Sequence, residues 1–189
     1  MDRGAIQKKQ LIIEKAAEVF AEKGFLKVTM KDIVEACGIS RGGLYRYYSS
    51  TAQIFLEAAE QEMRDKQVSF AEKIEEDATN KEVIALFLKQ EKETVLKGRL
   101  NKAMFEFYSE NKVSGRENIL HRQRAYQTKS LEKLIWNGVE NGEFFCRNPK
   151  REAEHMTLAL AGLKVGLLTG EADAEILDDE IAYLLDRLV

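Results

Sequence analysis

The sequence is short of proline, cysteine and histidine, and each shortage excludes a class of structure or site. A single proline, Pro149, among 189 residues leaves long helices uninterrupted. Cys37 and Cys146 lie far apart with no CxxC pair, so we expect two reduced thiols, with a redox switch or a metal site as the alternatives. His121 and His155 have no His or Cys neighbour at ligand spacing, and we predict neither a metal site nor a cofactor.

Long apolar runs are also missing. The longest candidate, residues 156–168, is too short to cross a membrane and contains Lys164. No basic-then-apolar leader opens the chain. With 44% hydrophobic and 32% charged residues, the chain has the composition of a helical globular protein of one or two domains. We predict an all-α, cytoplasmic protein with no membrane partner.

The run from Thr29 to Tyr48 has the spacing of two short helices separated by a glycine turn. Four apolar residues recur at helical spacing in its first half, and Thr29 with Asp32 three residues on predicts a capping box at the helix start. Gly38 supplies the freedom for a tight turn, and Ser40 is the predicted N-cap of the second helix. This is the arrangement of a helix-turn-helix motif.

The second predicted helix exposes a face that suits DNA better than water. Leu44 and Tyr48 point to the core, which leaves two arginines, two tyrosines and two glycines outside. Glycine near a helix start costs about 1 kcal/mol relative to alanine. That cost is explained if the backbone approaches a phosphate while arginine and tyrosine reach base edges. The distribution of charge also favours DNA binding at this end of the chain. Residues 1–50 hold nine Lys or Arg against six Asp or Glu, whereas the remaining residues hold 20 Lys or Arg against 26 Asp or Glu.

This stretch resembles the N-terminal domain of TetR-family transcriptional regulators. The resemblance covers residues 1–56 closely and rests on Gly24, Phe25, Thr29, Met30, Ile33, Val34, Gly38, Ile39, Ser40, Gly43, Leu44, Tyr45, Tyr48 and Ser50. Two positions depart from the family pattern. Cys37 stands where alanine is usual, and Thr51 stands where a phosphate-contacting lysine is usual, which leaves hydroxyl and amide donors in its place.

The resemblance implies a double-stranded DNA operator as partner. The arginines of the second helix are predicted to contact bases or phosphates, and its tyrosines phosphates or thymine methyl groups. Two residues at the start of the preceding helix are predicted backbone anchors. The predicted DNA-contacting residues are Thr29, Lys31, Ser40, Arg41, Gly42, Gly43, Tyr45, Arg46, Tyr47 and Thr51.

Further helices are predicted on both sides of this motif. The first spans Ile6 to Lys23, and Ser50 with Gln53 predicts a capping box that opens a long helix to about residue 77. The remaining predicted helices cover residues 80–97, 100–111, 118–141, 149–169 and 174–188, with a loop at 112–117. We predict a helix-turn-helix DNA-binding domain at residues 1–50, joined by the long helix to a helical ligand-binding and dimerisation domain at residues 51–189.

Aromatic and methionine side chains recur in the C-terminal part. The predicted lining of an apolar ligand cavity is Phe87, Met104, Phe105, Phe107, Tyr108 and Trp136. The alternative is that they fill the core. The resemblance implies a ligand pocket, and this composition favours an apolar or planar effector over a sugar phosphate, a preference that a few buried charges would reverse.

The last two predicted helices carry more apolar surface than a monomer leaves exposed. Glycines recur every four residues in the first of them, which lets another helix approach closely. The predicted homodimer interface is Leu160, Leu163, Gly166, Leu167, Leu177, Ile181, Leu184 and Leu185. Packing within one subunit is the alternative.

These patterns predict a DNA-binding transcriptional regulator that is not an enzyme. The resemblance implies a repressor that binds a palindromic operator as a homodimer and is released by an unknown small molecule. An enzyme is the first alternative, but no catalytic triad, phosphate loop or metal-spaced cluster occurs in the sequence. A helical protein-interaction module and an activator without ligand control are the others.

Overall fold

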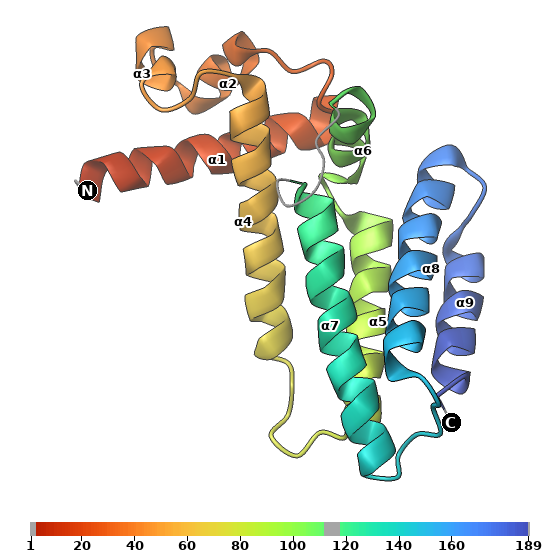
Figure 1. Cartoon of the computed structure of the whole chain (residues 1–189). Helices are drawn as coiled ribbons and strands as arrows, with labels where there is room; N and C mark the ends of the chain where they lie inside the picture. Colours follow the sequence, from red (N-terminus) through yellow and green to blue (C-terminus); the bar gives the residue numbers. More distant parts are fainter. Residues whose placement is uncertain (1–2, 112–117, 189) are drawn as a thin grey trace. The chain divides into compact units, whose positions relative to one another are not determined.

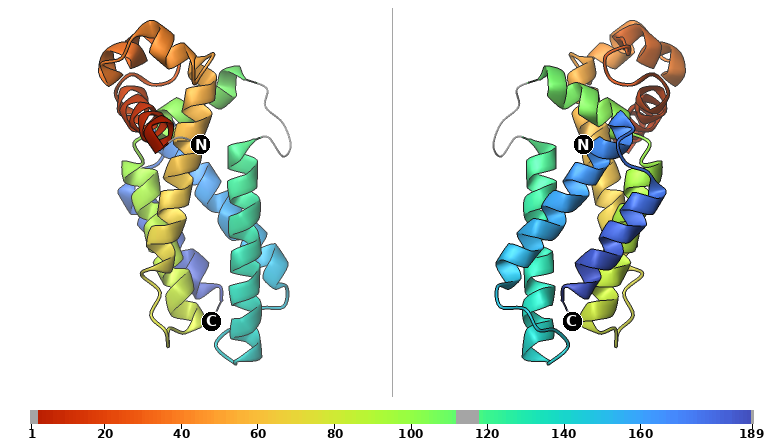
Figure 2. Two further views of the ribbon diagram at one scale, coloured as in Figure 1. Left: turned by 90° about the vertical axis from the view of Figure 1, so that its left-hand side faces the viewer. Right: turned by 90° about the vertical axis from the view of Figure 1, so that its right-hand side faces the viewer.

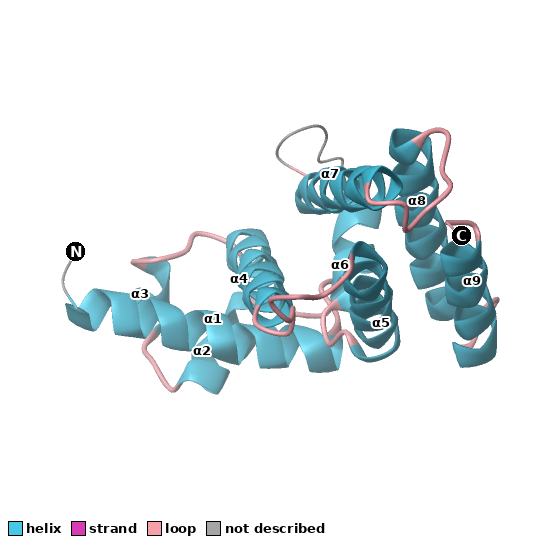
Figure 3. Ribbon diagram, turned by 90° about the horizontal axis from the view of Figure 1, so that it is seen from below, coloured by secondary structure: helices cyan, strands magenta, loops and turns pink. Residues whose placement is uncertain are grey.

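All secondary structure that the computed structural model describes is helical, which confirms the predicted all-α class (Figures 1 and 3). The described residues are 3–111 and 118–188, so the loop predicted at 112–117 lies outside them. None of the described helices is long and apolar enough to span a membrane. The helices are α1 (Arg3–Lys23), α2 (Met30–Cys37), α3 (Arg41–Tyr45), α4 (Thr51–Ala71), α5 (Asn80–Lys97), α6 (Asn101–Glu110), α7 (Ile119–Glu140), α8 (Pro149–Thr169) and α9 (Ala174–Asp186).

The predicted extension of α4 to residue 77 is wrong, because the helix ends at Ala71. Ile74, which continues the apolar stripe in sequence, is 38% exposed and so provides no packing to hold another turn. The acidic residues at positions 75–77 would also oppose the negative end of the helix dipole. A new helix then starts at a capping box, in which the Glu82 N–H donates to the Thr79 hydroxyl and Glu82 accepts from the Thr79 N–H at 2.8 Å.

The capping box predicted at the start of α4 forms only in part. The Gln53 N–H donates to Ser50 Oγ at 3.3 Å, as predicted. The Gln53 side chain, however, accepts from the Ser49 N–H at 2.9 Å and from the Ser49 hydroxyl at 3.0 Å. The return contact has therefore moved one residue toward the N-terminus, and Ser49 and Ser50 share the capping of α4.

The chain folds into two compact units. The first contains the described residues of 1–66 and 99–119, and the second those of 67–98 and 120–188. Both units draw on two separate segments, because α6 packs on α1 rather than beside α5 in the second unit. The functional boundary predicted between residues 50 and 51 concerns DNA and ligand binding and stays a prediction.

An aromatic cluster forms the centre of the first unit. Phe20 of α1 and Phe55 of α4 are fully buried with ring centroids 5.1 Å apart. Phe107 of α6 completes the cluster, with its ring 5.1 Å from Phe55 and 4.9 Å from Phe25. The Phe20–Phe55 and Phe25–Phe107 pairs are edge-to-face, a geometry that is favourable beyond the area it buries. Helix α6 is thus part of the core on which the helix-turn-helix motif rests.

A carboxylate of α6 also fixes the turn that follows α1. The Leu26 N–H donates to Glu106 Oε2 at 3.0 Å. Gly24, which ends α1 with φ at +79°, lies so close that a Cβ added to it would sit 2.5 Å from the same oxygen. Glycine is required here both for the left-handed backbone and for the approach of the carboxylate. The turn between α1 and α2 is therefore anchored by α6.

The second unit is held together by apolar faces of four helices. Helix α5 packs against both α8 and α9, and these two meet at the turn that joins them (Figure 2). Phe144, in the connection after α7, lies against Gly138, where an added Cβ would fall 2.1 Å from its ring. The buried core residues are Ile84, Leu88, Leu131, Ile135, Phe144, Ala153, Met156, Leu160, Leu184 and Leu188.

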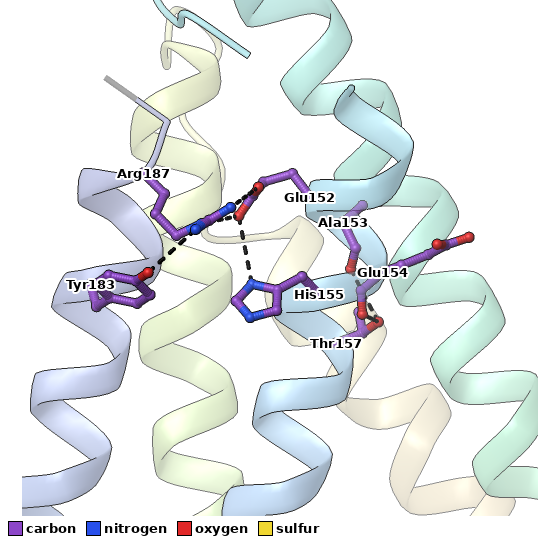
Figure 4. Close-up of polar contacts among 7 residues, drawn as sticks. All are labelled: Glu152, Ala153, Glu154, His155, Thr157, Tyr183 and Arg187. Atoms are coloured by element: carbon purple, nitrogen blue, oxygen red, sulfur yellow. Dashed lines mark hydrogen bonds and ion pairs between the residues drawn. The ribbon is translucent and has the colours of Figure 1, made fainter. Parts of the chain in front are cut away.

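A bidentate ion pair joins α8 to the C-terminal end of α9 (Figure 4). Arg187 Nε and Nη2 donate to the two carboxylate oxygens of Glu152, each at 2.8 Å, and Nη1 donates to the Tyr183 hydroxyl at 3.3 Å. Glu152 is buried, with His155 Nδ1 3.7 Å from one of its oxygens. Hydrogen bonding from Arg187 lowers the pKa of Glu152 below its ordinary value, although burial opposes the shift.

This pair predicts a loss of stability in acid. Because the pKa of Glu152 is lower in the folded than in the unfolded protein, its stabilisation is complete above the ordinary value of 4.5 and is lost as the pH falls through the folded value. We expect Glu152→Gln to lower the free energy of unfolding at neutral pH by about 1–3 kcal/mol, with the deficit shrinking as the pH falls below 4.5. Urea midpoints measured from neutral to acidic pH check this, with the exposed Glu140→Gln as control. A deficit that is constant with pH would contradict it.

Candidate nucleic-acid interface

Helices α2 and α3 form the predicted helix-turn-helix with the predicted caps. Thr29 caps α2, since its hydroxyl accepts from the Asp32 N–H while its own N–H donates to Asp32 Oδ2 at 2.8 Å. Gly38 ends the helix in the left-handed conformation, with φ at +62°. Ser40 caps α3 by accepting from the Gly43 N–H at 3.1 Å. These local contacts fix the angle at which α3 leaves the motif.

The outer surface of α3 is cationic and aromatic. Arg41, Gly42 and Tyr45 are exposed, as is Arg46 directly after the helix, whereas Leu44 is fully buried. The Arg41 guanidinium lies over the Tyr45 ring at 5.5 Å from its centroid. Such stacking orders a long side chain while its donors stay available. The surface therefore offers positioned guanidinium groups to an anion.

Three of the predicted contact residues are less exposed to solvent than the sequence indicated. Helix α3 ends at Tyr45, so Tyr47 falls in the following turn, where it is half-buried, packs against the core and has the Arg46 guanidinium 5.8 Å from its ring centroid. Gly43 is half-buried, and a Cβ there would lie 3.1 Å from Ser40 Oγ, so this glycine makes room for the cap. Thr51 is half-buried at the first position of α4.

The two predicted backbone anchors at the start of α2 are both exposed. Thr29 already uses its hydroxyl in the capping box, and Lys31 approaches Glu35 only loosely, at 3.7 Å between charged atoms. A surface pair at that distance contributes little energy, so the lysine ammonium can turn toward a phosphate at small cost. Their roles in DNA binding stay predictions.

A hollow of about 220 Å³ lies between α1 and α3. Its lining is Lys8, Leu11, Ile12, Ile39, Ser40, Gly43, Arg46 and Tyr47. In the sequence, Lys8 and Lys9 near the start of the first helix fit either phosphate contacts or a solvated charged end, and neither is among the predicted contact residues. Lys8 is exposed and lines the same hollow as Arg46, so it extends the cationic surface beyond α3.

A polar network holds the end of the motif against α1 and α4. The Tyr48 hydroxyl donates to Glu57 Oε2 at 2.9 Å, and Lys9 Nζ lies 2.7 Å from Glu57 Oε1. Burial, together with the neighbouring Glu57 carboxylate, raises the pKa of Tyr48, which keeps the phenol protonated. Because Lys9 is held in this pair, Lys8 is the better placed of the two lysines for a phosphate.

The predicted ligand residues are divided between the two units. Phe107 belongs to the aromatic core of the first unit, which favours the core-filling alternative for this residue. Met104 and Tyr108 are half-buried against the same core, and Phe105 is exposed. In the second unit Phe87 packs against the core with its ring 6.2 Å from Phe70, whereas Trp136 is exposed. Their part in ligand binding stays a prediction.

The predicted dimer residues lie partly inside the second unit. Leu160, Leu177 and Leu184 are buried within a single subunit, so they cannot meet a partner. Helices α8 and α9 carry apolar residues on more than one face, so the sequence pattern alone does not show which face is buried within the subunit and which is exposed. Leu163, Gly166, Leu167, Ile181 and Leu185 are half-buried. The large apolar side chains of α8 and α9 that the structure leaves exposed are Leu158, Val165, Leu168, Ile176 and Tyr183.

A capped pair of short helices with a basic outer face defines a helix-turn-helix DNA-binding protein. Residues 12–58 match the model of the family described as bacterial regulatory proteins, tetR family. The chain belongs to the TetR family. Within residues 3–111 and 118–188 no group of His, Cys, Asp and Glu side chains is placed to hold a metal ion.

Similarity to other regulators of this kind extends over most of the chain. The HTH-type transcriptional regulator YfiR of Bacillus subtilis is 31% identical over 139 residues, which cover 70% of this chain and 66% of YfiR, just under two thirds of its length. A TetR transcription regulator from Haloarcula marismortui has the same fold, with a TM-score of 0.84 at 15% identity over 96% of this chain and 98% of its own. FadR from Bacillus subtilis, solved with stearoyl-CoA, gives 0.73 at 20% identity over 95% and 99%.

Proposed function

We propose that this protein is a transcriptional repressor that binds a palindromic operator as a homodimer in the cytoplasm and is released by a small molecule bound within its second unit. The observation that carries the proposal is the outer face of α3, where Arg41 and Arg46 lie over tyrosine rings beside a glycine that leaves the backbone open. Guanidinium groups so placed match guanine edges and phosphate oxygens. DNA is the polyanion that fits this surface.

The exposed apolar face of α8 and α9 supports the homodimer. Leu158, Val165 and Leu168 follow one another at helical spacing on α8, with Gly162 exposed between them. A glycine in that row lets a second helix approach closely, and Ile176 and Tyr183 continue the apolar surface on α9. A two-fold dimer through this face presents two copies of α3, and therefore requires two half-sites related by a palindrome.

The release step is supported by the relative FadR, which was solved with stearoyl-CoA. An effector that prefers the conformation unable to bind DNA shifts the population away from the operator complex. A preference of about 5.5 kcal/mol moves the equilibrium from 1:99 to 99:1, and a smaller one gives partial release.

The test is a selection of genomic DNA fragments by the purified full-length chain. We expect one enriched palindrome, with retention that falls steeply as salt rises. A competing fragment in which one half-site is scrambled should be retained far less than the intact palindrome. Retention that is independent of sequence, or absent at moderate salt, would contradict the proposal.

A further inference from the structure

A carboxylate lies in the middle of the apolar face of α5. Glu91 follows Leu88 and precedes Val95 on the face of the helix that is buried, and its side chain is only 8% exposed. An acidic side chain in the interior is costly unless it is paired, and a pair of charges is often no more stable than apolar side chains of the same volume. Packing alone therefore does not explain why a carboxylate occupies this position.

Two other helices supply the partners of this carboxylate. Gln127 Nε2 of α7 donates to Glu91 Oε1 at 2.8 Å, and Lys164 Nζ of α8 donates to Oε2 at 2.9 Å. All three residues lie within the second unit. They form a polar layer across α5, α7 and α8, which we call the Glu91 layer.

The Glu91 layer is adjacent to the apolar core. Each of its residues is three or four positions from a core leucine of its own helix, namely Leu88, Leu131 and Leu160. One helical turn therefore separates the charged group from an apolar surface on all three helices. A molecule seated here meets a carboxylate at one end and aliphatic side chains at the other.

The two charges of the pair are not equally fixed. The Lys164 side chain is 28% exposed, against 8% for Glu91. Lysine carries its charge on a flexible four-carbon stem, so the ammonium can move into water. The carboxylate cannot follow, because it is held on the inner face of α5. An incoming group that takes the place of Lys164 must therefore be a cation, since an anion drawn to Lys164 would leave Glu91 buried without its counter-charge.

We propose that the Glu91 layer is an effector site for an organic cation with an apolar body, such as a hydrophobic amine or quaternary ammonium compound. Lys164 occupies the cation position in the protein without effector and is displaced by it. This inference rests on the proposed function, because it assigns the chemistry of the effector. Composition favoured an apolar or planar effector. The buried carboxylate of Glu91 adds a positive charge to the properties expected of that effector.

Calorimetry with three probes that share a ten-carbon chain tests the charge preference: decyltrimethylammonium and decanoate, each below its micelle-forming concentration, and decanol below its solubility limit. We expect the ammonium compound to bind with one site per subunit and more tightly than the other two. Glu91→Gln should weaken its binding by about tenfold or more, because a charged partner is lost. Lys164→Gln, which removes the competing cation and keeps a donor for Glu91, should strengthen it. The matched control is Lys89→Gln, which replaces an exposed lysine of α5, the helix that carries Glu91.

The opposite responses of the two variants exclude a purely structural role, which would weaken binding in both. Circular dichroism shows whether Glu91→Gln folds. If it does not, the binding of the ammonium compound to Lys164→Gln, expected to be tighter than to the unmodified protein, still tests the inference. Tighter binding of decanoate than of the ammonium compound, or equal ammonium binding by all variants, would overturn the inference. Operator release is measured separately. Ammonium binding without release contradicts the proposed function alone, whereas release by another class of molecule without ammonium binding contradicts the inference alone.

Discussion

Replacing Arg41 and Arg46 together by alanine is expected to lower affinity for the selected operator by about 100-fold or more. Each arginine contact to a base edge or phosphate is worth about 1–3 kcal/mol, and every 1.4 kcal/mol is a factor of about ten in affinity. Both side chains are exposed, and their guanidinium groups lie over the rings of Tyr45 and Tyr47. Stability should therefore change by no more than about 0.5 kcal/mol for each substitution.

Fluorescence anisotropy with a labelled operator, measured over a series of salt concentrations, checks this expectation. Loss of phosphate contacts also predicts a shallower dependence of affinity on salt. A matched double variant, Arg124→Ala with Arg147→Ala, removes two exposed arginines of the second unit and should retain most of the affinity. Equal losses in the two double variants would show that net charge, and not the face of α3, determines binding.

Phe55→Ala is expected to lower the free energy of unfolding by about 3–5 kcal/mol. The ring is fully buried and lies 5.1 Å from Phe20, 5.2 Å from Phe25 and 5.1 Å from Phe107. Its removal leaves a cavity among side chains from α1, α4 and α6 that rigid rings cannot fill. Because a whole domain is typically stable by about 5–15 kcal/mol, DNA binding should be lost at physiological temperature.

Urea denaturation followed by circular dichroism measures this loss. Phe145→Ala is the matched control, since that ring is 79% exposed and its truncation should cost at most about 0.5 kcal/mol. A loss below about 1 kcal/mol for Phe55→Ala would mean that the cluster collapses to fill the space, in contrast to the behaviour of most large-to-small core substitutions.

The parts of the fold that follow from local chemistry could be predicted from the sequence. The caps at Thr29 and Ser40 and the left-handed turn at Gly38 each depend on residues within four positions of one another. Sequence spacing is sufficient for such features because the contacts lie within the spacing itself. The same rules predicted that Arg41, Gly42 and Tyr45 are exposed on α3, but not that Gly43 and Tyr47 are half-buried.

Features that depend on distant contacts could not be predicted in this way. In the sequence Phe107 is one of several crowded aromatic residues, and only its packing with Phe25 and Phe55 places it in the core. Helices α8 and α9 carry apolar residues on more than one face, so their periodicity did not separate Leu160 from Leu158. Glu91 looks like any charged residue of a surface helix, because its partners are 36 and 73 positions away.

The place of α6 in the first unit has a consequence for how the protein is made. Helix α6 contributes Phe107 to the aromatic core and Glu106 to the turn after α1, yet it emerges from the ribosome after all of α5. The unit that carries the helix-turn-helix motif therefore cannot complete its core while the ribosome has synthesised only the motif itself. Nascent chains that end near residue 66 should stay open to proteases and chaperones, and become resistant only once α6 has returned to close the core.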